Sequence, residues 1–165
     1  MEQKVAVYRK EHFNAAHRLF CAEWSAEKNK QVFGACSNPN YHGHNYELIV
    51  QVTGLPDPVT GFVINTKELS TIVQEEIVAR FDHKNLNLDT DAFKNLNPTA
   101  ENIAIVIYNL MRPRIQNTLE LKIRLNRPIK YEKRSKKLFP VFKNRENIFL
   151  PKLTFEESIL CNFEF

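Results

Sequence analysis

Alternating apolar and polar positions predict two strands in the first third of the chain. The segment 5–17 carries apolar residues at most of its odd positions, although charged residues interrupt this face. In 44–53 the even positions are apolar and polar residues alternate with them: Tyr46, Leu48, Val50 and Val52. Residues 19–41 lack periodicity and predict a long loop. Residues 54–61, with two glycines and two prolines, predict a turn.

Two helices are predicted in the middle of the chain. Asn65-Thr-Lys-Glu68 has the form of a capping box, and apolar residues at helical spacing support a helix over 66–80. Asn97-Pro98 opens a second helix, with proline in its first turn, and the apolar face of that helix runs to about Pro113. Between the helices, 82–87 is rich in loop-forming residues.

A third strand is predicted at 119–125, where the residues alternate again. The element order is therefore β-β-α-α-β, typical of the α+β class, with a final strand expected but not legible. The segment 127–165 differs from the rest, because it holds six of the twelve phenylalanines and none of the four glycines. We interpret 1–126 as one domain and 127–165 as a divergent, basic and Phe-rich tail.

Composition narrows the function classes. The net charge of +4 arises entirely in the tail, because residues 1–126 hold 14 basic and 14 acidic side chains. We therefore expect no nucleic-acid partner. No apolar run approaches the roughly 20 residues of a membrane helix, and the first residues lack the apolar core of a secretory signal. The odd, scattered set Cys21, Cys36 and Cys161 argues against a disulfide framework, so we expect a cytoplasmic protein.

Three of the five histidines lie at the ends of strands that can pair: His17, His42 and His44. Residues two apart on a strand face the same side, so His42 and His44 present both imidazoles together. Neutral imidazole binds zinc, and three protein ligands leave one position open for water or substrate. The alternative at this point is a set of strand-edge histidines that face solvent.

Cys36 and the pair Asp82-His83 are further candidates for chemistry. A loop rich in Asn and Pro can fold back and bring the Cys36 thiol near a metal at the strand end, where a cation would favour the thiolate. A carboxylate that holds one imidazole nitrogen orients the ring, but adjacent residues do this only in an irregular turn. The alternatives are an inert buried cysteine and a helix cap. Glu101 is a fourth candidate. Its alternative is a purely structural role, in which the negative charge near the start of a helix complements the helix dipole.

An ordered set of short motifs resembles 6-pyruvoyltetrahydropterin synthase and its relatives. The motifs run in order across roughly residues 5–126 and include every candidate named above. They are Phe13-Asn-Ala-Ala-His17, Cys36-Ser-Asn-Pro-Asn-Tyr-His-Gly-His-Asn-Tyr46, Asp57-Pro-Val-Thr-Gly61, Phe81-Asp-His-Lys-Asn-Leu-Asn87, Pro98-Thr-Ala-Glu-Asn102 and Leu121-Lys-Ile-Arg-Leu125.

The resemblance implies a fold and an assembly. Members of this family adopt the tunnelling fold, a β-β-α-α-β-β unit with an antiparallel sheet and two helices on one face. Three units close a barrel, and two trimers pair into a homohexamer with sites between subunits. We therefore expect a homotrimer or homohexamer.

The resemblance also implies a reaction. Zinc is held by the residues that match His17, His42 and His44, and the substrate is 7,8-dihydroneopterin triphosphate. In the family a cysteine that matches Cys36 acts as base. It is assisted by an Asp–His pair that matches Asp82 and His83. Triphosphate is eliminated, so the expected enzyme is a carbon–oxygen lyase of tetrahydrobiopterin biosynthesis. Thr99 and Glu101 match residues that line the pterin pocket.

Two alternatives to this reaction stay open. The related 6-carboxytetrahydropterin synthase of queuosine biosynthesis uses the same scaffold, but its cysteine usually lies four residues before the His-Gly-His pair. Here Cys36 lies six residues before His42, which favours the pyruvoyl type. The other alternative is a pterin- or zinc-binding homologue with impaired catalysis.

The chain departs from the family pattern immediately after Asn126. Family members continue with a Glu-Thr pair, whose glutamate accepts hydrogen bonds from the pterin ring. Here Arg127-Pro-Ile-Lys follows, and arginine would present donors to donors. The altered composition of 127–165 fits an out-of-frame translation of AT-rich DNA, and a genuine tail that covers the barrel is the alternative. We expect weak pterin binding and an irregular tail.

Overall fold

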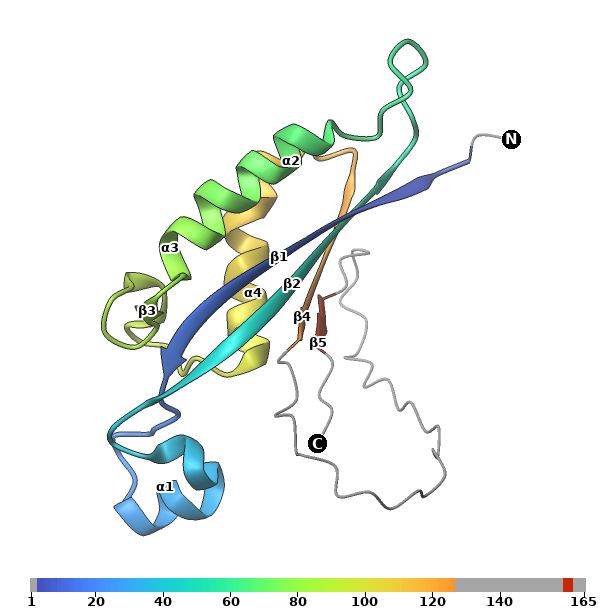
Figure 1. The fold of residues 1–165 in the computed structure, drawn as a ribbon. Helices are drawn as coiled ribbons and strands as arrows, with labels where there is room; N and C mark the ends of the chain where they lie inside the picture. Colours follow the sequence, from blue (N-terminus) through green and yellow to red (C-terminus); the bar gives the residue numbers. More distant parts are fainter. Residues whose placement is uncertain (1–2, 127–158, 162–165) are drawn as a thin grey trace, which may run out of the picture.

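The computed structural model describes residues 3–126 and 159–161, and two long strands dominate it (Figure 1). Strands β1 (Val5–His17) and β2 (His42–Gly54) pair antiparallel along their whole length. The register runs from Val5 opposite Gly54 to His17 opposite His42. This confirms both predicted strands, and the second begins two residues earlier than the alternation indicated.

The remaining strands extend this pair on both sides, in the order β3-β1-β2-β4-β5. Strand β4 (Glu120–Asn126) pairs antiparallel with β2, as the alternation at 119–125 predicted. The short strands β3 (Lys84–Asn85) and β5 (Ile159–Cys161) pair parallel with β1 and β4, respectively. The three longer strands therefore pair antiparallel, as expected, and the two short edge strands add parallel pairing, so that the sheet as a whole is mixed.

Both predicted helices cover one face of the sheet (Figure 1). Helix α2 (Thr66–Val73) continues through a π-helical stretch (Gln74–Val78) into α3 (Ala79–Phe81). Asn65 caps α2, as predicted, by accepting a hydrogen bond from Lys67 N–H at 2.9 Å. Short 3-10 turns lie at Asp91–Phe93 and Arg112–Arg114.

Helix α4 (Ala100–Met111) begins later than predicted. Thr99 is its cap and accepts from Asn102 N–H at 3.3 Å. Pro98 therefore precedes the cap instead of occupying the first turn, because a threonine hydroxyl can satisfy a free N–H of the helix and proline cannot.

The core lies between the sheet and these helices. Leu48, Val50 and Ile123 project from the sheet and are fully buried, and side chains from both helices pack on them. The main helical contributors are Leu69, Val73, Ile77, Phe81, Ile103, Ile107 and Met111. Alternation along β1 and β2 therefore assigns one face of the sheet to the core, and His17, His42 and His44 share the parity of that face.

The prediction of a loop over 19–41 was wrong in its middle. Helix α1 (Ala26–Phe33) and a 3-10 helix (Gly34–Ser37) occupy this segment, at the end of the long strands (Figure 1). Ser25 caps α1 by accepting from Lys28 N–H, and Gly34 follows it with a positive φ of 55°. Most of α1 is exposed, so no apolar stripe marks it in the sequence.

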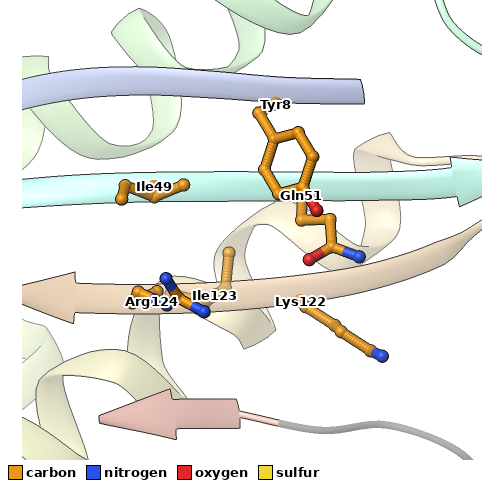
Figure 2. Close-up of a pocket in the computed structure, with 6 residues that line it drawn as sticks. All are labelled: Tyr8, Ile49, Gln51, Lys122, Ile123 and Arg124. Carbon is orange, nitrogen blue, oxygen red and sulfur yellow. The ribbon is translucent and has the colours of Figure 1, made fainter. Parts of the chain in front are cut away.

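The opposite face of the sheet is open in the described chain. It carries a shallow pocket lined by Tyr8, Ile49, Gln51, Lys122, Ile123 and Arg124 (Figure 2). Tyr8 is 62% exposed, and Lys10 and His12 flank Glu47 on the same face. Lys10 holds the pKa of Glu47 below its ordinary value, so this carboxylate stays ionised at neutral pH. This face offers both apolar area and charge to a partner.

Two further expectations concern the tail and membrane spans, and both depend on which residues the structure describes. The predicted irregularity of 127–165 lies outside them, apart from the three residues of β5. Across residues 3–126 and 159–161, no helix combines the length and apolar character that a membrane span requires.

Candidate metal centre and neighbouring residues

The three candidate histidines converge at the end of the β1–β2 pair. His17 lies directly opposite His42 in the register, and His44 lies opposite Ala15, one pleat away on the same face. One nitrogen from each ring lies within 4.8 Å of the other two, and His17 Nε2 and His42 Nε2 are 3.1 Å apart. His17 is fully buried, whereas the other two are half-buried. Solvent or a ligand therefore reaches the three histidines from the side of His42 and His44.

The spacing of the His17 and His42 nitrogens fits a tetrahedral metal. Two imidazole nitrogens that share a tetrahedral ion at 2.0–2.1 Å lie about 3.3 Å apart, close to the observed 3.1 Å. The rings meet edge to face, with centroids 4.6, 4.7 and 4.9 Å apart, so they do not stack on one another. The three histidines could therefore hold one metal ion.

A backbone carbonyl orients the buried histidine of the cluster, His17. His17 Nδ1 lies 2.7 Å from the carbonyl oxygen of Pro98, which can only accept. The proton therefore sits on Nδ1, and the lone pair of Nε2 points to the other histidines, an arrangement common in metal sites. Pro98 was missed as a site residue from the sequence, because a carbonyl contact leaves no signal in residue type.

Cys36 lies in the 3-10 helix Gly34–Ser37, which is bonded to the residues after the end of β1. Its thiol is free and half-buried. Its carbonyl accepts from Leu19 N–H at 2.8 Å, and the carbonyl of Ser37 accepts from Arg18 Nε at 2.9 Å. These bonds hold the Cys36 loop against the two residues that follow His17.

Asp82 and His83 form the predicted contact between adjacent side chains. Asp82 Oδ2 and His83 Nδ1 are 2.8 Å apart, and His83 adopts a positive φ of 56°, the irregular turn that this contact requires. Asp82 Oδ1 accepts from Asn14 N–H at 2.7 Å, and His83 N–H donates to Asn14 O at 2.7 Å. The bond from Asn14, aided by His83, holds the pKa of Asp82 below its ordinary value. Asp82 thus remains a carboxylate that fixes the imidazole.

This dyad lies at the edge of β1, away from the three histidines of the same chain. Asn14 precedes His17 by three residues, roughly 10 Å along an extended strand. The His83 side chain is 79% exposed. The structure therefore brings Cys36 to the residues after His17 but leaves the Asp82–His83 dyad at the surface of the chain.

Thr99 and Glu101 lie at the start of α4, next to the carbonyl that orients His17. Thr99 acts as the helix cap, so its hydroxyl is already engaged with Asn102 N–H. Glu101 is exposed in the first turn, where its charge complements the helix dipole. Both residues follow Pro98, whose carbonyl contacts His17 of the candidate metal centre. Thr99 also caps the helix, and Glu101 also complements its dipole.

Comparisons with known proteins agree with this arrangement. Residues 6–135 match a family described as 6-pyruvoyl tetrahydropterin synthase. A 6-pyruvoyl tetrahydrobiopterin synthase of Poecilia reticulata is 41% identical over 120 residues, 73% of this chain and 82% of the relative. The Homo sapiens protein of that name is 44% identical over 103 residues, 62% of this chain and 71% of the relative. The structure of Caenorhabditis elegans 6-pyruvoyl tetrahydropterin synthase has a TM-score of 0.67 and 30% identity, and the match covers 78% of this chain and 98% of that chain.

Proposed function

The chain belongs to the 6-pyruvoyl tetrahydropterin synthase family, and we propose that it converts 7,8-dihydroneopterin triphosphate to 6-pyruvoyltetrahydropterin. Triphosphate leaves in this reaction, so the enzyme is a carbon–oxygen lyase. The observation that carries the proposal is the cluster of His17, His42 and His44 with the Cys36 loop bonded beside it. Two free thiols, Cys21 and Cys36, suit a reducing compartment, and we propose a cytoplasmic location.

We propose zinc as the metal that the three histidines hold. All three donors are imidazoles, which suit zinc, and the 3.1 Å between the His17 and His42 nitrogens fits tetrahedral geometry. When bound, the ion withdraws electron density from the oxygens of the substrate side chain and so acidifies the neighbouring carbon-bound proton. Pro98 keeps His17 in the tautomer that such binding needs.

The side chains of the protein move the protons. The Cys36 side chain, as thiolate, takes the carbon-bound proton, and the loop that carries it is bonded to the residues that follow His17. The imidazole of His83, fixed by Asp82, assists this transfer as a proton carrier. Thr99 and Glu101 line the pterin pocket at the start of α4.

We propose that this activity resides in a homotrimer or homohexamer. The exposed His83 lies roughly 10 Å along β1 from His17, so a neighbouring subunit is better placed to use the dyad. In the described part of the chain the sheet face around Tyr8 is exposed, and closing a barrel with other copies would cover it.

Light scattering tests the assembly. We expect the mass of a trimer or hexamer at micromolar protein, because an open sheet face and exposed edges favour association. Tyr8→Glu would add a charge to the open face and should shift the mass toward the monomer, whereas Val59→Glu, on the exposed 54–61 turn, should not. A stable monomer of the unmodified protein at this concentration would contradict the proposed site between subunits.

Product identification tests the reaction itself. Purified protein incubated with 7,8-dihydroneopterin triphosphate should release triphosphate and yield the 6-pyruvoyl product, seen by mass spectrometry. We expect this product because Cys36 lies six residues before His42, the spacing of the pyruvoyl type. A 6-carboxy product would instead favour the queuosine enzyme.

The product assay can be repeated on a variant that carries the family's Glu-Thr pair after Asn126, where this chain has Arg127 and Pro128. The double substitution Arg127→Glu, Pro128→Thr restores the acidic residue that family members use to hold the pterin. We expect faster turnover and a lower KM, because a carboxylate accepts from the ring N–H groups, whereas an arginine in its place would present donors to donors. Absence of turnover in both proteins, with metal bound, would show a pterin- or metal-binding homologue without this catalysis.

A further inference from the structure

Four consecutive residues, His17 at the end of β1 and the three that follow it up to Phe20, together bond to three other segments of the chain: 36–37, 87 and 97–98. His17 contacts Pro98 O, Leu19 N–H donates to Cys36 O, and Phe20 N–H donates to Asn97 Oδ1 at 3.2 Å. Arg18 lies in the middle and makes the largest set of contacts. This short stretch therefore links the metal ligand, the Cys36 loop and the start of α4.

The backbone of Arg18 is held by one side chain. Asn87 Oδ1 accepts from Arg18 N–H at 2.8 Å, and Asn87 Nδ2 donates to Arg18 O at 3.0 Å. An amide that satisfies both groups of one residue acts like a neighbouring strand and fixes the backbone there. Asn87 is itself anchored, because Leu86 is fully buried and its N–H donates to Ala16 O.

The side chain of Arg18 reaches from this fixed backbone to the Cys36 loop. Its Nε donates to Ser37 O at 2.9 Å, and its guanidinium lies 4.0 Å from the centroid of the Phe20 ring. A charge-assisted bond to a carbonyl is stronger than a neutral one, and stacking on a ring restricts the planar group to one orientation. Arg18 therefore restrains the residue next to Cys36.

We propose that Arg18 and Asn87 are positioning residues for the Cys36 thiol, an inference that rests on the proposed function of Cys36 as base. Asn87 fixes the backbone of Arg18, and Arg18 fixes the loop that carries Cys36. Asn87 follows the Asp82–His83 turn along the chain, and its bonds to Arg18 connect this segment to the residue after His17 and, through Ser37 O, to the loop of Cys36. Catalysis needs this restraint, since a misplacement of about 1 Å can cost about 100-fold in rate.

Substitution of Arg18 tests the proposal through two readouts. Arg18→Met keeps a long unbranched stem and removes the donor to Ser37 O. We expect kcat to fall about 10- to 100-fold with KM little changed. We also expect iodoacetamide to alkylate Cys36 several-fold faster, because the released loop exposes a half-buried thiol. Metal content should equal that of the unmodified protein, and Arg18→Lys, which keeps a charged donor, should recover part of both effects.

Three controls separate positioning from general damage. Peptide mapping follows Cys21 in the same molecule, whose alkylation rate should not change. Arg80→Met, at an exposed arginine paired with Glu76, should leave both readouts unchanged. Asn87→Ala should act in the same direction as Arg18→Met, whereas Asn109→Ala, at an exposed position of α4, should not.

The alkylation readout requires no substrate, so it tests the positioning role even if the proposed reaction fails. An unchanged alkylation rate of Cys36 in Arg18→Met would overturn the proposal. So would an equal rise at Cys21 and Cys36, which indicates general loosening, or a loss of metal, which assigns the effect to His17.

Discussion

Replacing Cys36 by alanine should abolish turnover of the triphosphate substrate and leave the metal content unchanged. The thiol is proposed as the base, and removing a positioned general base typically costs about 10²- to 10⁴-fold in rate. Cys36 lies on the 3-10 helix beside Leu19 and is not among the three residues that could hold the metal. The measurement is steady-state turnover, accompanied by elemental analysis of the same sample.

Cys21→Ala is the matched control for this result. Cys21 is also free and half-buried, but its backbone is hydrogen-bonded to Asn29 of α1 and not to the residues next to His17. We expect its removal to be silent. Equal losses of activity in the two variants would show that Cys36 has no special role.

Loss of one imidazole from the metal centre should release the ion. His44→Ala removes one of the three ring nitrogens that lie within 4.8 Å of one another, and two histidines hold zinc far more weakly than three. We expect elemental analysis to find one zinc per chain in the unmodified protein and little in the variant. Thermal stability should fall as well, because an ion that binds only the folded state stabilises it.

His12→Ala tests whether the loss is specific to the site. His12 lies on β1, but on the opposite face of the sheet near Glu47, with its side chain 67% exposed. Its removal should leave the metal content unchanged. Full zinc retention in the triple variant His17→Ala, His42→Ala, His44→Ala would refute the assignment of the centre.

Local patterns predicted the elements whose stability depends on one apolar face. Strands β1, β2 and β4 and the helices α2 and α4 were all recognised, since alternation and helical spacing record which side of each element is buried. Helix α1 was missed because a buried amide, Asn29, and a serine cap hold it instead of an apolar stripe. Strand β3 was missed because two residues are too few to form a pattern.

The sequence by itself determined the residues of the candidate site: three histidines of matching parity at strand ends, a cysteine in a loop rich in Asn and Pro, and an adjacent Asp-His pair. Residue type and position along a strand are local properties, and so they can be recognised in one amino-acid sequence. The tertiary structure decided which of them meet. The β1–β2 register sets His17 opposite His42, and the contact with Asn14 turns His83 outward at the edge of the sheet. The bonds from Pro98, Arg18 and Asn87 also emerged only in the fold, because backbone contacts between distant segments depend on packing and leave no pattern along the chain.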